Sequence, residues 1–163
     1  MVAESEGCPV DVFDRILADF EPMTTVLTEF VRSFDVDYSI SLGSDFEVDL
    51  DEMKIIYAIA LADKSATAFR DNFIARFPAC ADFDIFTLSL MHELGHLETE
   101  YDMIDDSAER STISDNSEYF DLYNERIATD WAGEYLTANH DDMKKWESKV
   151  LAIFKKIFDK YED

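Results

Sequence analysis

The stretch His92-Glu93-Leu94-Gly95-His96 decides how the rest of this sequence is interpreted. It has the form HExxH, in which two histidines stand four residues apart. On an α-helix such residues lie on one face, one turn apart, so both imidazoles can bind the same Zn²⁺ ion. The glutamate between them then lies where it can take a proton from a zinc-bound water. The motif therefore predicts a zinc site with His92 and His96 as ligands and Glu93 as the catalytic base.

The residues around the motif have the pattern of a helix. Asp82 or Asp84 precedes an apolar run and can act as its N-cap. Gly95 is unusual inside a helix, where glycine costs about 0.5–1 kcal/mol relative to alanine. We therefore expect another part of the chain to approach the helix closely at Gly95. The apolar stripe that would face a core recurs at helical spacing and consists of Ile85, Leu88, Met91 and Leu94 or Leu97.

The rest of the chain predicts helices around a small sheet of about three strands. Pro22 should kink or break the first helix near Phe20-Glu21, and Asn139 should end the helix before the last one, which Asp141 can cap. Residues 102–117 are acidic, lack periodicity and are expected to be a flexible connection. Helical spacing covers residues 10–33, 65–77, 118–138 and 141–158, whereas alternating or β-branched runs predict strands at 37–42, 46–50 and 54–60.

Composition indicates one folded domain over residues 1–163, with residues 1–9 as a short acidic tail. Hydrophobic residues make up 47% of the sequence and aromatic residues 13%, which is enough for a core. No apolar run has the length of a bilayer, and the N-terminus carries no export signal, so we expect a cytoplasmic protein that does not enter membranes. Cys8 and Cys80 fit no metal or redox pattern.

The formal net charge of −23 is the second strong property of the sequence. It argues against nucleic-acid binding, because the phosphates would be repelled from almost any face. It is compatible with steering basic polypeptides toward the molecule, although it is equally compatible with a role in solubility alone.

A catalytic zinc needs a third protein ligand, and three carboxylates are candidates. Glu125 belongs to a later helix that could pack against the motif helix and direct its carboxylate at the metal. Asp102 follows His96 by six residues, in a pattern similar to the metzincin-like variant HExxHxxGxxD, although Thr99 stands at the glycine position. Glu100 would lie one further turn along the motif helix, in line with the two histidines, and its geometry nearly excludes it.

Around Glu125 the sequence resembles a known family. HELGH followed after a few tens of residues by E-x-x-A-[DN]-x-[FW]-A-x-x-[LY]-L is similar to the ImmA/IrrE-type gluzincin peptidase domain. The resemblance implies that Glu125 is the third zinc ligand. Thr129 stands where the family usually has Asp or Asn, a residue expected to brace a ligand histidine by a hydrogen bond, and the adjacent Asp130 could substitute for it. The matching residues are Glu125, Ala128, Trp131, Ala132, Tyr135 and Leu136.

This resemblance covers about residues 10–140 and implies an α+β, zincin-like (minigluzincin) fold. Its elements would be an N-terminal helix, a small, mostly antiparallel sheet, the HExxH helix, the third-ligand helix and a C-terminal helix. The implied protein is a zinc metallopeptidase, a hydrolase that cleaves a peptide bond through a zinc-bound water. Its substrate would resemble a regulatory protein such as a phage or mobile-element repressor.

Two other interpretations remain. The domain could be a binding or regulatory module that keeps the zincin fold without turnover, but the intact Glu93 argues against it. An interaction protein with a fortuitous HExxH is harder to reconcile with the motif around Glu125. If the protein is a peptidase, a tyrosine can assist at the carbonyl oxygen, whereas His140 is expected to be an exposed or helix-capping residue. The candidate tyrosines are Tyr101, Tyr119, Tyr123 and Tyr135.

Overall fold

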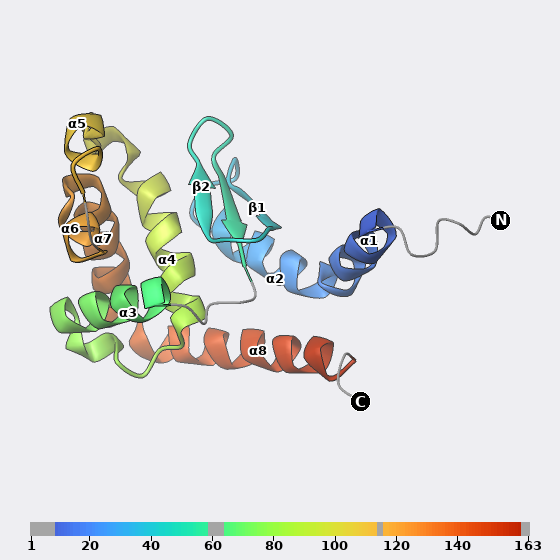
Figure 1. Ribbon diagram of the computed structural model, residues 1–163. Coiled ribbons are helices and arrows are strands. Elements are labelled where there is room, and N and C mark those ends of the chain that lie inside the picture. The colour runs from blue at the N-terminus through green and yellow to red at the C-terminus, as the bar shows by residue number, and fades with distance from the viewer. Residues whose placement is uncertain (1–8, 59–63, 114–115, 161–163) are drawn as a thin grey trace.

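A computed structural model describes residues 9–58, 64–113 and 116–160, and it has the predicted α+β class (Figure 1). Residues 1–8 of the predicted tail and residues 59–60 of the third predicted strand lie outside the described residues. No helix in the described part of the chain has the length and apolar character needed to cross a membrane. The α-helices are α1 (Pro9–Asp19), α2 (Glu21–Arg32), α3 (Lys64–Arg76), α4 (Ile85–Glu98), α5 (Ser107–Arg110), α6 (Asn116–Asp121), α7 (Tyr123–Ala138) and α8 (His140–Asp159). The strands are β1 (Ser39–Leu42), β2 (Glu47–Asp49) and β3 (Lys54–Tyr57), and two short 3-10 helices are η2 (Pro78–Cys80) and η3 (Glu100–Asp102).

The N-terminal helical region is divided where the sequence predicts. Phe20 separates α1 from α2, and Pro22 lies in the first turn of α2, where its missing N–H leaves no hydrogen bond unmade. Phe20 is itself buried, so the break brings an aromatic side chain into the core.

The sheet is mixed, which corrects the expectation of a mostly antiparallel arrangement. Its order is β1-β3-β2, with β3 parallel to β1 and antiparallel to β2. The strand that takes the centre is the most apolar one, and its residues Ile55 and Tyr57 have no exposed surface. A central strand is protected on both edges, so this order buries the β-branched strand and leaves the short, polar β2 at an edge.

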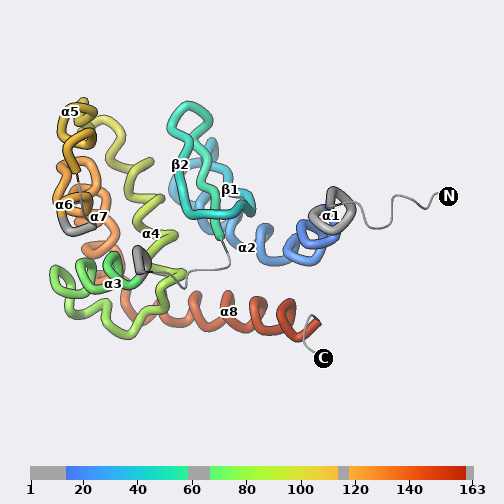
Figure 2. Tube along the Cα trace, viewed as in Figure 1, coloured from blue at the N-terminus to red at the C-terminus, as the bar shows by residue number. Residues whose placement is uncertain are grey.

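Helix α4 runs through the middle of the molecule, between the sheet and α7 (Figures 1 and 2). Eleven of its 14 residues are buried. A helix that is buried on nearly all sides belongs to the interior of a domain, whereas a single apolar stripe is typical of a surface helix. The predicted stripe therefore underestimates the burial of α4, which also includes the polar side chains of Thr87, His92 and His96.

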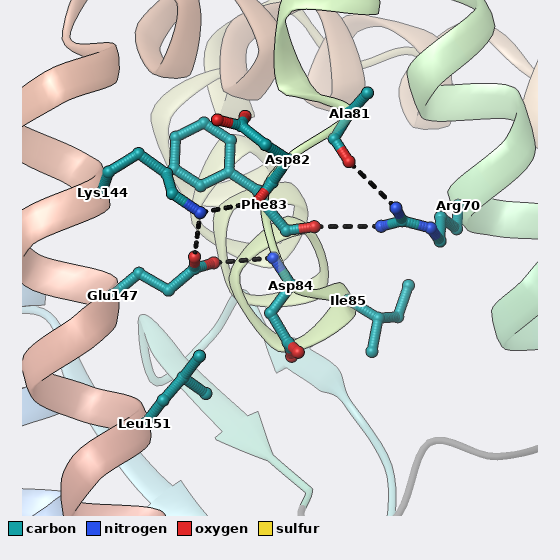
Figure 3. Close-up of a pocket in the computed structure, with 9 residues that line it drawn as sticks. All are labelled: Arg70, Ala81, Asp82, Phe83, Asp84, Ile85, Lys144, Glu147 and Leu151. Carbon is teal, nitrogen blue, oxygen red and sulfur yellow. Dashed lines mark hydrogen bonds and ion pairs between the residues drawn. The ribbon is translucent and has the colours of Figure 1, made fainter.

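The N-terminal end of α4 is held by side chains from two other helices (Figure 3). Asp84 caps the helix by accepting a hydrogen bond from the backbone N–H of Phe86 at 2.9 Å, so it is the N-cap of the two predicted candidates. Glu147 of α8 accepts from the backbone N–H of Asp84 at 2.7 Å and from the hydroxyl of Thr87 at 2.6 Å. These bonds fix the end of α4 that lies two turns before the HExxH motif.

The loop before α4 is fixed as well. Arg70 of α3 donates to the carbonyl oxygens of Phe83 at 2.9 Å and Ala81 at 3.0 Å. Lys144 of α8 lies 2.8 Å from Glu147 and also donates to the carbonyl oxygen of Asp82 (Figure 3). Helices α3 and α8 therefore position α4 together.

The region after α4 differs from the prediction in two respects. The stretch 102–117, predicted to be a connection without regular structure, contains α5 and the beginning of α6. The helix predicted over residues 118–138 is two helices, because Leu122 has an extended backbone with ψ of 142° between α6 and α7. The chain thus leaves α4, forms α5, and returns through α6 into α7 (Figure 2). This break starts α7 at Tyr123, so that Glu125 lies in its first turn.

Candidate metal centre

The two histidines of the motif lie one turn apart on the buried face of α4. His92 is 5% exposed and His96 is 6% exposed, and their ring centroids are 4.7 Å apart. Phe69 of α3 packs edge-on against the His92 ring at 5.3 Å between centroids. A helix with HExxH spacing therefore presents both imidazoles to one point, as the motif predicts.

Glu125 of α7 completes the group. Its Oε1 atom lies 2.9 Å from Nε2 of His92 and 3.2 Å from Nε2 of His96. The three ligand atoms lie within 4.8 Å of one another and all three residues are buried. Among the described residues this is the only group of three or more His, Cys, Asp or Glu side chains with such spacing. The alternative third ligand, Asp102, is exposed in η3 and does not belong to the group, and Glu100 does not belong to it either.

Gly95 allows the two ligand-bearing helices to approach each other. A Cβ atom placed on Gly95 would overlap the backbone carbonyl oxygen of Ala128 on α7. The close approach expected from this interior glycine is therefore confirmed, and its partner is the helix that carries Glu125. Any larger residue at Gly95 would push α7 away and withdraw Glu125 from the two imidazoles.

Thr129 and Asp130, the two residues expected to brace a ligand histidine, have different partners. Oγ1 of Thr129 lies 2.9 Å from Nδ1 of His92, deep in the protein. Asp130 instead forms an ion pair with Arg76 of α3. A hydroxyl both donates and accepts, so Thr129 can remain bonded to His92 in either imidazole tautomer, whereas a carboxylate only accepts. Nδ1 of His96 is buried without a hydrogen-bond partner in the described structure, so His92 is the more firmly oriented of the pair.

Glu93 lies between the two histidines on α4 and is only partly buried. Burial raises the pKa of its carboxyl group above the ordinary value for glutamate. The neighbouring carboxylates of Glu125 and Glu47 act in the same direction, while the two histidines oppose them. A glutamate whose pKa lies closer to neutrality is better matched to accepting and returning a proton.

Glu125 has the opposite electrostatic character. Burial alone would raise its pKa, but the hydrogen bonds and charges of His92 and His96 outweigh burial and lower the pKa far below the ordinary value. Burial would lower the pKa of His96, yet the bond to Glu125 raises it overall. The cluster thus holds one buried negative charge directed at two imidazoles. This negative charge would attract a cation bound between the three groups.

Arg110 is the site residue that sequence analysis missed. It lies on α5, and its Nη2 atom donates to Oε2 of Glu125 at 2.8 Å, while its Nε atom donates to Asp106 at 2.8 Å. Its guanidinium also lies over the ring of Tyr119, 5.4 Å from the centroid. No motif or periodicity distinguishes this arginine, because it belongs to the acidic stretch predicted to be a flexible connection.

Of the four candidate tyrosines, Tyr119 is the one whose ring contacts Arg110, the partner of Glu125, although 38% of its surface is exposed. Burial and the charges of Glu125 and Glu93 raise its pKa to about 12 although its bond to Arg110 opposes the shift. The other three candidates lie in different surroundings: Tyr101 is 100% exposed, Tyr123 lies beside Arg126, and Tyr135 stacks on Trp131.

His140 lies outside the cluster, as expected. It is the first residue of α8 and contacts the side chain of Asp82 at 2.9 Å and that of Asp141 at 3.1 Å. Hydrogen bonds to Asp141 and Asp82 raise its pKa. The third histidine thus joins surface groups at the start of α8 and serves as a natural control for the other two.

Comparisons of this chain with protein-family models, with curated proteins and with solved structures give no match. The resemblance to the ImmA/IrrE-type domain therefore depends on the HExxH and Glu125 motifs alone. The geometry of the cluster is independent of that resemblance.

Proposed function

We propose that this protein is a zinc-dependent metallopeptidase of the gluzincin type. His92, His96 and Glu125 would hold the zinc, and Glu93 would act as the general acid and base. The observation that carries the proposal is the convergence of three buried ligand atoms from α4 and α7 within 4.8 Å of one another. The order of sheet, HExxH helix and ligand helix also agrees with the zincin-like (minigluzincin) fold that the sequence resemblance implies.

The chemistry of the donors favours zinc over other metals. Two imidazoles and one carboxylate are a frequent ligand set of catalytic zinc in peptidases, and they leave one position open. Buried in a low-dielectric interior, the Glu125 carboxylate would offset much of the cation's charge. When bound, Zn²⁺ supplies Lewis-acid activation of a water molecule and of the scissile carbonyl group.

The chain's own residues would then move the proton. Glu93 accepts a proton from the attacking water on its carboxylate and returns it to the nitrogen of the leaving amine. Tyr119 would donate a hydrogen bond from its phenol to the carbonyl oxygen as negative charge develops there. A pKa of about 12 keeps this phenol protonated at neutral pH.

The proposed substrate class rests on the resemblance, and the net charge is compatible with it. With a net charge of −23, the protein attracts basic polypeptide segments and repels nucleic acids. We therefore propose a protein or peptide substrate with basic character, of which a regulatory protein such as a phage or mobile-element repressor is the type that the resemblance suggests.

The test begins with zinc content. The full chain is reconstituted with zinc, desalted and analysed by mass spectrometry of the metal, and we expect about one zinc per chain. The double variant His92→Ala, His96→Ala should lose the zinc, whereas His140→Ala, which removes the one histidine outside the cluster, should retain it. Absence of zinc from the reconstituted wild type would contradict the proposal.

The same samples then test catalysis. Zinc-loaded wild type and Glu93→Gln are incubated with a peptide mixture from a digested cell lysate, and new termini are identified by mass spectrometry. We expect new termini with wild type only, because Gln keeps the shape of Glu93 but does not accept the proton. If both proteins retain zinc and neither produces new termini, the protein is a zinc-binding module and the peptidase proposal is wrong.

A further inference from the structure

The two oxygens of Glu125 have different partners. Oε1 faces the two Nε2 atoms of His92 and His96, at 2.9 and 3.2 Å. Oε2 accepts a hydrogen bond from Nη2 of Arg110 at 2.8 Å. Only one oxygen is therefore directed at the point where the two imidazoles meet, and the other is bonded to the guanidinium of Arg110.

Arg110 is itself held from two further sides. Its Nε atom donates to Oδ1 of Asp106 at 2.8 Å, and Asp106 is buried. The guanidinium lies over the ring of Tyr119. Because the guanidinium is planar and its donors have fixed directions, these contacts determine where its remaining N–H groups point. Arg110 is thus a fixed partner of Glu125, although its side chain retains 36% of its exposed surface.

The segment that carries Arg110 is also attached next to Glu125. The amide side chain of Asn124 accepts from the backbone N–H of Ile104 at 2.9 Å and donates to the Ile104 carbonyl at 2.7 Å. Asn124 is buried and immediately precedes Glu125 in the first turn of α7. The segment from Ile104 to Arg110 is therefore joined to α7 at both of its ends, by Asn124 and by Glu125.

We propose that Arg110 is a positioning residue that restricts Glu125 to binding the metal through one oxygen. This inference rests on the proposed zinc site and adds a residue that the HExxH and Glu125 motifs do not contain. A carboxylate without such a partner can turn to bind a metal through both oxygens, which raises the coordination number and takes up space beside the metal that a water or a substrate oxygen would use. By occupying Oε2, Arg110 keeps Glu125 in the arrangement that leaves room for a water and a substrate oxygen.

The test measures the metal site directly. Zinc affinity is measured by competition with a chelator for wild type, Arg110→Ala and Arg76→Ala, and each protein is also loaded with Co²⁺ and its visible spectrum recorded. Arg76→Ala is a matched control, because Arg76 also pairs a carboxylate of α7, Asp130, from another helix. We expect Arg110→Ala to weaken zinc binding by roughly 10- to 100-fold, because the side chain of Glu125 is then no longer held in its ligand orientation before the metal binds. Its Co²⁺ absorption should also fall, because Co²⁺ of higher coordination number absorbs more weakly than tetrahedral Co²⁺. Arg76→Ala should change neither quantity.

A second variant guards against a general loss of structure in Arg110→Ala. Asp106→Ala keeps the arginine but removes the carboxylate that orients its guanidinium. Zinc affinity and Co²⁺ absorption should therefore change in the same direction as in Arg110→Ala, but by less. If wild type binds both metals and Arg110→Ala has the wild-type affinity and spectrum, Arg110 does not position Glu125, and the zinc site itself remains supported. If wild type binds neither metal, the proposed zinc site is wrong, and the role of Arg110 is wrong with it.

Discussion

Glu125 of α7 and Glu147 of α8 are two buried glutamates that contact different parts of α4: Glu147 contacts its first turn, and Glu125 contacts the two histidines of the HExxH motif. Each is only 3% exposed, and each accepts at least three hydrogen bonds or ion-pair contacts. By burial and by hydrogen bonding they are equivalent. They differ in the kind of group that faces them.

The partners of Glu147 are a backbone N–H, the hydroxyl of Thr87 and the ammonium of Lys144. These groups satisfy a buried carboxylate by donating to it, and neither the N–H nor the ammonium has a lone pair to offer a metal. The partners of Glu125 on its Oε1 side are two imidazoles, and an imidazole nitrogen that loses its proton becomes a metal ligand. Glu147 therefore stabilises the fold at the start of α4, whereas Glu125 contacts two imidazoles at which a metal cation can replace a proton.

The comparison shows that burial of a charged residue does not by itself indicate a functional site. A paired carboxylate in the interior is as compatible with a helix anchor as with a metal ligand. A helix anchor and a metal ligand differ in whether the groups that contact the carboxylate can lose a proton and bind a metal ion in its place. Helix α4 uses both arrangements, with a fixed end at Asp84 and the candidate site two turns later.

Replacing Glu125 is expected to have the largest effect. Zinc sites with four ligands bind with about 10–16 kcal/mol, or roughly 2.5–4 kcal/mol per ligand, so Glu125→Gln should weaken zinc binding by roughly 100- to 1,000-fold. Competition with a chelator measures this, and circular dichroism of the metal-free protein checks that the fold persists. Unchanged zinc affinity in Glu125→Gln would show that the third ligand lies elsewhere in the chain.

The same substitution at Glu147 should act on stability instead. Glu147→Gln replaces the carboxylate with a neutral amide beside the Lys144 ammonium, and hydrogen bonds to charged groups contribute about 1.5–3 kcal/mol. We expect the metal-free protein to lose about 2 kcal/mol, which corresponds to a fall in Tm of roughly 4–8 °C for a domain of this size. Zinc affinity, measured well below the new Tm, should stay within about twofold of wild type, on the order of 0.4 kcal/mol. A loss of zinc binding as large as that of Glu125→Gln would remove the distinction between the two glutamates.

The sequence predicts one side of this comparison well and the other poorly. His92, Glu93 and His96 belong to a local pattern with a fixed geometry on a helix, and Glu125 was identified through a motif around it. Glu147 and Arg110 belong to no such pattern, because their roles depend on partners brought together by the tertiary fold. Thr87 and Glu147 are 60 residues apart in the chain. Helical periodicity indicates that a residue faces inward, but it does not indicate which residue it meets.

The same limit explains the differences in the fold. Alternation of polar and apolar residues predicts the first two strands, and a β-branched run predicts the third. The side-chain period is two in parallel and antiparallel pairs alike, so neither pattern determines the order β1-β3-β2. The apolar pattern of residues 118–138 also continues across Leu122, although the backbone becomes extended there. In both cases the decisive contribution comes from packing between distant segments.

The smallest effects are expected from replacing two threonines, one in contact with Glu147 and the other in contact with a histidine beside Glu125. Thr87 donates its hydroxyl to Glu147, and Thr129 contacts Nδ1 of His92, and both are buried. Thr→Val keeps the shape of the side chain and removes the hydroxyl. Thr87→Val should destabilise the metal-free protein by about 1 kcal/mol, because Glu147 loses one of its donors, and should leave zinc affinity unchanged.

Thr129→Val should show the reverse dependence. With zinc bound to Nε2, the Nδ1 atom of His92 carries a proton that needs an acceptor, and valine offers none. We therefore expect zinc affinity to fall by roughly 10-fold, the low end of the effect of such outer partners, because one hydroxyl is a weaker brace than a carboxylate. Chelator competition and thermal unfolding, measured on both variants with and without zinc, separate the two effects. Equal losses of zinc affinity in Thr87→Val and Thr129→Val would mean that the two ends of α4 are coupled through the helix, so that anchor and site are parts of one unit.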